Sequence, residues 1–246
     1  IFSQQQEARS RVGTGANSIK SPEIYLNEMR LIKSDFEINR MREATQISAE
    51  AHELVRESIS SKKNERQIQG LIEGFFLEKG ARGPAYNSIV ASGDNACILH
   101  YTLNNSELNN GDLLLVDAGC SLIDYYNGDI TRTFPIGGKF SKEQKLIYEI
   151  VLEAQKNAIK NSVKGSNSTT VHNVALRILV EGLKEIGLLR GDTDGIIENG
   201  SYKHLYMHRT GHWLGLDVHD VGAYRMGEYD VPLQNGMILT VEPGIY

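Results

Sequence analysis

Apolar residues recur every three or four positions in the first long patterned stretch of the chain, which is the period of an amphipathic helix. The stretch opens at Ser34-Asp35-Phe36-Glu37, a capping-box sequence whose side chains satisfy the first free N–H groups of a helix. The apolar positions that follow are Ile38, Met41, Ala44, Ala51 and Leu54. A second helix is expected from Asn64 to just before Gly80, because glycine readily adopts the left-handed cap conformation. The pattern therefore predicts two consecutive helices.

Short β-rich runs follow from Tyr86, and they read NSIVAS, ACILHY, DLLLVDAG and ITRTFPI. Turn signals at 109–112 and 127–129 separate them. A third helix is predicted from Ser141 to near Gly165, and a fourth over 170–187. The apolar face of the third helix comprises Ile147, Ile150, Val151, Ala154 and Ala158.

The last part of the chain returns to a strand-like pattern around His208, His219 and Leu239. The order of elements is then two helices, strands, two helices and strands. This order predicts an α+β fold with an arrangement that occurs twice, although no repeat is visible at the level of residues.

Composition narrows the class of protein. The chain has 246 residues, of which 40% are hydrophobic and 23% charged, and its net charge is −5. These values are typical of a soluble globular protein that is large enough for one extensive domain. The charge and the lack of a Lys/Arg cluster argue against nucleic acid as a partner. No apolar run approaches the roughly 20 residues of a membrane span.

Two cysteines, Cys97 and Cys120, have no CxxC spacing. Reduced thiols in a cytoplasmic protein are therefore expected. Residues 1–33 show little periodicity and are interpreted as a linker or the tail of a missing N-terminal domain. The chain lacks an initiator Met and stops just after a strand-like run, so both ends look like cuts. Residues 34–246 are expected to be one domain, truncated at its C-terminus.

Two aspartates are the first candidates for chemistry. Asp117 ends the apolar run LLLVD, where a buried carboxylate is costly unless it is paired or binds a cation. Asp129 follows twelve positions later, after Asn-Gly. Either residue alone reads equally as an ordinary turn aspartate. A hairpin between Cys120 and Gly128 would bring both carboxylates to neighbouring strands, where like charges need a cation to remain ionised.

Histidines provide the second signal. His208, His212 and His219 lie within twelve residues, and His100 could add a fourth imidazole. Arg209 and Thr210 follow His208, so the HExxH motif of zinc proteases is absent. One histidine alone is more often a satisfied core residue, but three of them together with two strand carboxylates favour a site. GxSxG, Walker A and GxGxxG sequences are also absent, which disfavours serine, phosphate-binding and dinucleotide mechanisms.

Glu242 precedes Pro243, which favours extended backbone and a side chain that projects from a strand end. Taken alone, it reads better as a surface glutamate. Together with the aspartates it makes an oxygen-rich set that favours Mn²⁺- or Mg²⁺-like ions, while a single imidazole leaves zinc or cobalt open. The sequence therefore predicts a hydrolytic metal centre that the fold assembles from distant segments.

Five stretches resemble the pita-bread metallopeptidases, and among them aminopeptidase P. They are ILHY, GDLLLVDAG, NGDITRTFP, YMHRTGHWLGLDVHDVG and GMILTVEPGIY, and they follow the family's order over most of residues 34–246. The resemblance implies a pita-bread (creatinase/aminopeptidase) fold of two similar halves, each with a helix pair over antiparallel strands.

The resemblance also implies roles for single residues. Asp117 would chelate one of two divalent ions, expected to be Mn²⁺, and Asp129 would bridge both. His212 and Glu242 would be further ligands, and Glu242 could also accept the proton of the nucleophile. His100, His208 and His219 match histidines that bind substrate and stabilise the tetrahedral intermediate.

The implied activity is release of the N-terminal residue from peptides with proline in the second position. The full-length protein is expected to be a homo-oligomer. A fifth ligand, a second glutamate, would lie beyond Tyr246, so this polypeptide alone is not expected to hold two ions tightly. Two alternatives stay open, a prolidase-type Xaa-Pro dipeptidase and a non-catalytic peptide-binding module.

Overall fold

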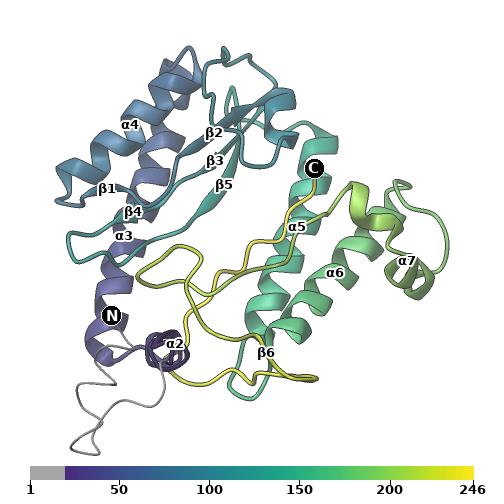
Figure 1. Cartoon of the computed structure of the whole chain (residues 1–246). Coiled ribbons are helices and arrows are strands. Elements are labelled where there is room, and N and C mark those ends of the chain that lie inside the picture. The colour runs from purple at the N-terminus through teal and green to yellow at the C-terminus, as the bar shows by residue number, and fades with distance from the viewer. Residues whose placement is uncertain (1–19) are drawn as a thin grey trace, which may run out of the picture.

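Two helix-and-strand halves, each with its own apolar core, face one another in the computed structural model, which describes residues 20–246 (Figure 1). The elements of the first half are α3 (Asp35–Ser58), η1 (Ile59–Ser61), α4 (Glu65–Glu78), β1 (Gly83–Pro84), β2 (Ile89–Ser92), η2 (Gly93–Cys97), β3 (Leu113–Asp117), β4 (Cys120–Ser121) and β5 (Thr131–Pro135). Those of the second half are α5 (Lys142–Asn161), α6 (Ser168–Glu185), α7 (Thr193–Asn199), η3 (Ser201–His204), β6 (Arg225–Met226) and β7 (Tyr229–Asp230).

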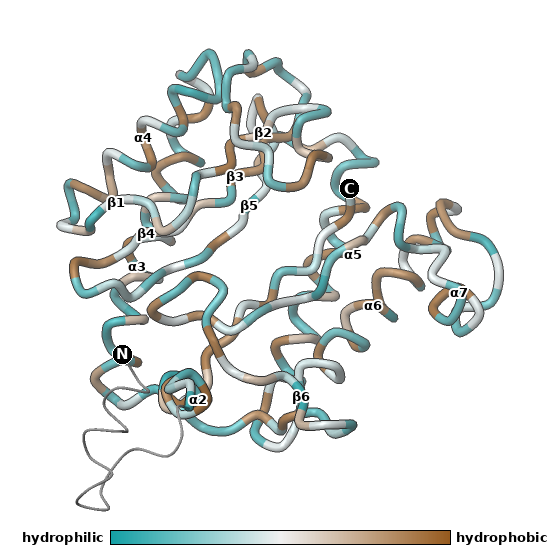
Figure 2. The backbone as a smooth tube through the Cα atoms, viewed as in Figure 1, coloured by the Kyte–Doolittle hydropathy of each residue, from teal (hydrophilic) through white to brown (hydrophobic). Residues whose placement is uncertain are grey.

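The first predicted helix pair is confirmed. Ser34 caps α3 in a capping box with Glu37, and Asn64 caps α4 by accepting a hydrogen bond from the backbone of Gln67. Both helices turn an apolar face to the core, and Figure 2 shows apolar stretches alternating with hydrophilic ones along them. The buried residues on these faces are Met41, Ala44, Ile47, Ala51, Val55, Ile68, Ile72 and Phe76.

The first-half sheet has the order β2-β3-β5, and both pairings are antiparallel. Asp117 lies opposite Thr131, so the start of β5 is beside the end of β3. The predicted hairpin connects them, with the Gly128 N–H bonded to the Cys120 carbonyl at 2.8 Å. The ends of these two strands lie at the side of the sheet that faces the second half (Figure 1).

The second helix pair is also confirmed. Ser141 and Gln144 form a capping box at the start of α5, and α6 begins two residues before the predicted position. The two helices approach closely because Gly182 has no side chain, and a Cβ there would lie only 2.7 Å from Ile150. Helix α7 and the β6–β7 hairpin were not expected from the sequence.

The strands expected around His208, His219 and Leu239 do not form a regular sheet. Residues 210–214 and 238–242 run antiparallel, with N–H···O bonds from Glu242 to Thr210 (2.7 Å) and from Thr240 to His212 (2.9 Å). Between these two described segments, only Trp213 and Leu239 form a β-bridge. The ladder is incomplete because the His212 N–H bonds to the Thr240 hydroxyl (2.9 Å) instead of its carbonyl.

Two further expectations differ from the structure. The ACILHY run, expected as a strand, forms the end of η2 and a turn, in which His100 has a φ of 55°. Helix α2 (Glu23–Leu31) lies within the stretch interpreted as a linker or tail. Several apolar side chains of this helix are exposed and only Leu31 is buried. The helix therefore has no continuous buried apolar face, which explains the weak hydrophobic periodicity of its sequence. Residues 1–19 lie outside the described part, and the domain division at residues 33 and 34 stays a prediction.

Among the described residues, the structure contains no helix with the length and apolar character that a bilayer crossing requires.

Candidate metal centre

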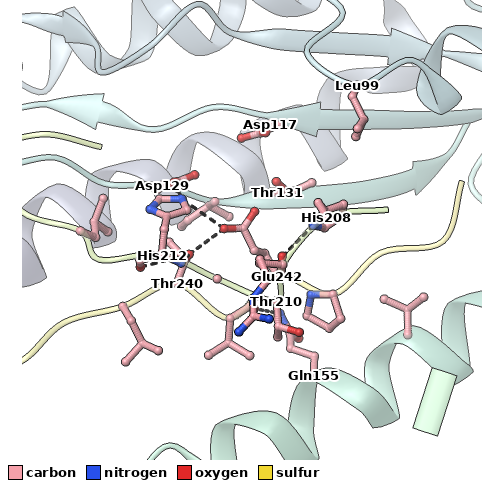
Figure 3. A pocket seen from close by; sticks show the side chains of 18 of the residues that line it. Leu99, Asp117, Asp129, Thr131, Gln155, His208, Thr210, His212, Thr240 and Glu242 are labelled. Atoms are coloured by element: carbon pink, nitrogen blue, oxygen red, sulfur yellow. Dashed lines mark hydrogen bonds and ion pairs between the residues drawn. The ribbon is translucent and has the colours of Figure 1, made fainter. Parts of the chain in front are cut away.

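The predicted ligands lie where the two halves face each other. Asp117 and Asp129 come from the β3–β5 hairpin, and His212 and Glu242 come from the antiparallel segments of the second half (Figure 3). All four line one cavity of about 1790 Å³. This volume exceeds the several hundred Å³ of most small-molecule pockets. Gln155 of α5 supports the Glu242 segment by donating to the Val241 carbonyl (3.2 Å).

Asp129, His212 and Glu242 form the tightest group. The His212 Nε2 lies 3.2 Å from Asp129 Oδ2 and 3.1 Å from Glu242 Oε1. Their ligand atoms lie within 4.8 Å of one another. Two carboxylates and one imidazole nitrogen thus converge from three segments, with Asp129 lying 83 positions before His212 and Glu242 lying 30 positions after it.

Tyr86 connects Asp117 to this group. Its hydroxyl lies 2.5 Å from Asp117 Oδ1 and 2.8 Å from Asp129 Oδ1. A phenol has one proton, so it cannot donate fully to two carboxylates at once. No local feature of the sequence selects Tyr86, because its partners lie 31 and 43 positions later.

The electrostatics indicate an excess of negative charge. Burial raises the pKa of Asp117 to about 7, with a further contribution from the charges of Asp129 and Glu242 and an opposing one from the Tyr86 hydrogen bond. Burial opposes protonation of His212, but its hydrogen bonds to Asp129 and Glu242 raise its pKa to about 10. A positive charge is thus strongly favoured between the carboxylates.

The surrounding hydrogen bonds orient these groups toward one point. The His212 Nδ1 lies 2.9 Å from the Trp213 carbonyl, which fixes the ring and directs Nε2 to the carboxylates. The Thr240 hydroxyl donates to Glu242 at 2.6 Å. A supporting carbonyl on the far ring nitrogen is the usual arrangement for a metal-ligating histidine. The donor set therefore fits a divalent cation in place of the proton on Nε2.

The other three predicted histidines line the same cavity. The His219 ring lies edge-on to His212, with ring centroids 4.3 Å apart. His208 packs between Tyr206 and Tyr246, and its buried Nε2 has no hydrogen-bond partner in the described part of the chain. His100 stands on the η2 side of the cavity, in left-handed backbone.

Two α+β halves with a cluster of carboxylates and one imidazole between them are the arrangement of the pita-bread metallopeptidase class. The chain belongs to metallopeptidase family M24, whose family model matches residues 39–246. Membership of this family implies divalent metal ions.

Named relatives agree with this assignment. The chain is 51% identical over 221 residues to the Xaa-Pro aminopeptidase of Haemophilus influenzae and 46% identical to that of Escherichia coli, covering 90% of this chain in each case. It spans about half the length of these curated relatives, 51% and 50%.

Solved structures show the same fold. Aminopeptidase PepP of Pseudomonas aeruginosa has a TM-score of 0.91 at 45% identity, with 98% of this chain and 55% of that chain covered. Aminopeptidase P of E. coli with the inhibitor Pro-Leu has a TM-score of 0.92 at 43% identity, with 99% and 55% covered. The predicted pita-bread fold is therefore confirmed.

Proposed function

We propose that the protein containing this chain is an Xaa-Pro aminopeptidase, which releases the N-terminal residue from peptides with proline in the second position. The observation that carries the proposal is the convergence of Asp129, His212 and Glu242 within 4.8 Å on the wall of a large cavity. The names of relatives that match nearly the whole chain support the substrate class.

Asp117, Asp129, His212 and Glu242 are the residues that would hold two divalent ions. When bound, such ions polarise a peptide carbonyl and make water a nucleophile at neutral pH. Mn²⁺ is the proposed ion, because carboxylate oxygens outnumber nitrogen in the donor set.

The remaining residues would bind substrate and move protons. Glu242 would accept the proton of the attacking water, held in place by Thr240 at 2.6 Å. His219 and His208 would donate hydrogen bonds to the developing oxyanion or to the proline carbonyl. The unpartnered Nε2 of His208 supports this assignment, because a buried imidazole nitrogen gains most from a new partner. His100 would bind substrate from the opposite wall.

The test is hydrolysis by the full-length protein loaded with Mn²⁺. We expect release of the first residue from an Xaa-Pro-Xaa tripeptide and much slower cleavage of an Xaa-Pro dipeptide. An enzyme active on the dipeptide alone would be a prolidase, a reading that the named relatives do not favour. Binding of less than one ion per chain, without hydrolysis, would indicate a peptide-binding module.

A cytoplasmic location and a homo-oligomeric state belong to the same proposal. The two cysteines form no disulfide, which supports a reducing compartment. Ultracentrifugation of the full-length protein tests the oligomeric state.

A further inference from the structure

Helix α2 and the residues just after it contact the loop that carries His219. This N-terminal part precedes residue 39, where the M24 match begins. We refer to residues 30–33 as the α2 anchor and to residues 215–222 as the His219 loop. Figure 1 shows α2 at the end of the molecule where loops of the second half also lie.

Charged side chains join the α2 anchor to the His219 loop. Asp220 accepts hydrogen bonds from Lys33 Nζ (2.9 Å) and from Arg30 Nη2 (2.5 Å). Arg30 also contacts Asp217 (2.7 Å). The Lys33 and Asp220 side chains are only 2% and 1% exposed. A buried charge that loses its partner is strongly unfavourable, so the two segments are held in one relative position.

Three glycines make this contact close. A Cβ at Gly215 would lie 3.0 Å from Lys33 Cε, and one at Gly222 would lie 2.7 Å from the Leu31 side chain. At Gly236 it would lie 2.9 Å from the Lys33 carbonyl, and the Lys33 N–H donates to the Gly236 carbonyl at 2.8 Å. Close approach at these three glycines shows that the α2 anchor packs against the second half in addition to forming the ion pairs.

Asp220 links the α2 anchor to the residues of the candidate metal centre. It directly follows His219, and its N–H bonds to the Trp213 carbonyl (3.0 Å). The same carbonyl accepts from His212 Nδ1 (2.9 Å). The 4.3 Å contact between the His219 and His212 rings therefore depends on where Asp220 is held.

We propose that Lys33, Arg30 and Asp220 are positioning residues that set the place of the His219 ring against His212. Residues that precede the M24 region thus help to build the catalytic site. This inference rests on the proposed function for its kinetic consequence, but its structural consequence is independent of that function.

The test uses the full-length protein with Lys33→Met, Asp220→Asn and the double variant. Asn and Met match the shapes of the residues they replace while removing the charges. The control is Arg177→Met, which breaks an exposed ion pair to Asp194 on α6 and α7. Four quantities are measured: kcat and KM on an Xaa-Pro-Xaa tripeptide with Mn²⁺, bound metal per chain, the thermal midpoint, and the histidine ring resonances of the metal-free protein.

We expect kcat of each single variant to fall by about 10- to 100-fold, since a small misplacement of a catalytic group has effects of that order. KM and metal content should stay near those of the unchanged protein. The double variant should recover much of the thermal midpoint, because both buried charges of the Lys33–Asp220 pair are then removed and the partly exposed Arg30 keeps Asp217 as a partner, but it should not recover kcat. The His219 ring resonances should shift in all three variants and not in Arg177→Met.

Recovery of kcat together with stability in the double variant would overturn the inference, because the pair would then be only structural. Unchanged kcat and unchanged His219 resonances in the single variants would also overturn it. If the unchanged protein does not cleave the tripeptide, the proposed function fails. The His219 resonances then decide the positioning role by themselves.

Discussion

Tyr86 contacts two of the candidate ligands, although its own sequence neighbourhood does not indicate such a role. Its hydroxyl is the contact between Asp117 and Asp129, and burial together with these two carboxylates raises its pKa well above the ordinary value. The phenol therefore stays protonated at neutral pH, and its single proton is shared between the two carboxylates. Removing it should disturb metal binding more than folding.

We expect Tyr86→Phe to weaken Mn²⁺ binding by about 10- to 100-fold, the usual effect of losing a partner that orients metal ligands. Titration calorimetry on the full-length protein measures this change. Tyr229→Phe, at a side chain that is 81% exposed, is the matched control. Equal affinities for the two variants would show that Tyr86 does not orient the carboxylates.

At the scale of elements, one carboxylate organises the connection between α4, β2 and the loop that carries His100. Glu65 is fully buried and accepts hydrogen bonds from the backbone of Ser92 (2.8 Å) and Ser106 (2.9 Å). The hydroxyls of Ser92 (2.8 Å) and Tyr101 (2.8 Å) and the Asn95 amide (3.0 Å) also donate to it. These donors turn ACILHY away from a strand and bring His100 to the cavity wall.

Glu65→Gln should destabilise the protein by about 1–3 kcal/mol. The Gln NH₂ group would replace an acceptor oxygen and face backbone N–H groups, which can only donate. Urea unfolding measures the change. Glu78→Gln, at an exposed position of the same helix, is expected to stay close to the unchanged protein. A loss of the same size in both variants would contradict the special role of Glu65.

Helix α3 supplies a pH-dependent contact. The His52 Nε2 lies 3.0 Å from the Ala118 carbonyl, and burial lowers its pKa from 6.5 to about 4. The unfolded chain therefore binds a proton between pH 6.5 and 4 that the folded protein does not, so stability is lost as pH falls through this range. A shift of this size corresponds to about 3 kcal/mol.

We expect the free energy of unfolding to fall between pH 6.5 and 4, and His52→Gln to reduce the slope. His172, whose pKa burial also lowers to about 4, adds a slope of the same sign that the variant retains. Chemical unfolding at a series of pH values provides the measurement. An unchanged slope in the variant would show that His52 does not carry the effect.

At the scale of the whole molecule, the candidate metal centre would connect the two halves, since Asp129 belongs to the first and His212 and Glu242 belong to the second. A cation that binds only the folded state should therefore stabilise both halves together. At a concentration 100 times its dissociation constant, the stabilisation is about 2.7 kcal/mol. We expect chelation to lower the thermal midpoint of the full-length protein. In Asp129→Asn the midpoint should not respond to metal, and a full response there would contradict the proposed ligand.

The helix pairs and the β3–β5 hairpin could be predicted from the amino-acid sequence, because capping residues, helical periodicity and turn signals act between neighbours in the chain. It also marked Asp117, Asp129, His212 and Glu242 as candidates, through their placement at strand ends and through the family resemblance. Three contacts became visible only in the folded molecule: Tyr86 with two carboxylates, Glu65 with the residues around the His100 loop, and the α2 anchor with the His219 loop. These contacts join side chains from about 30 to nearly 190 positions apart, and no local pattern records such a pairing. A buried polar group finds its partners in space, so their identity emerges only when the chain has folded.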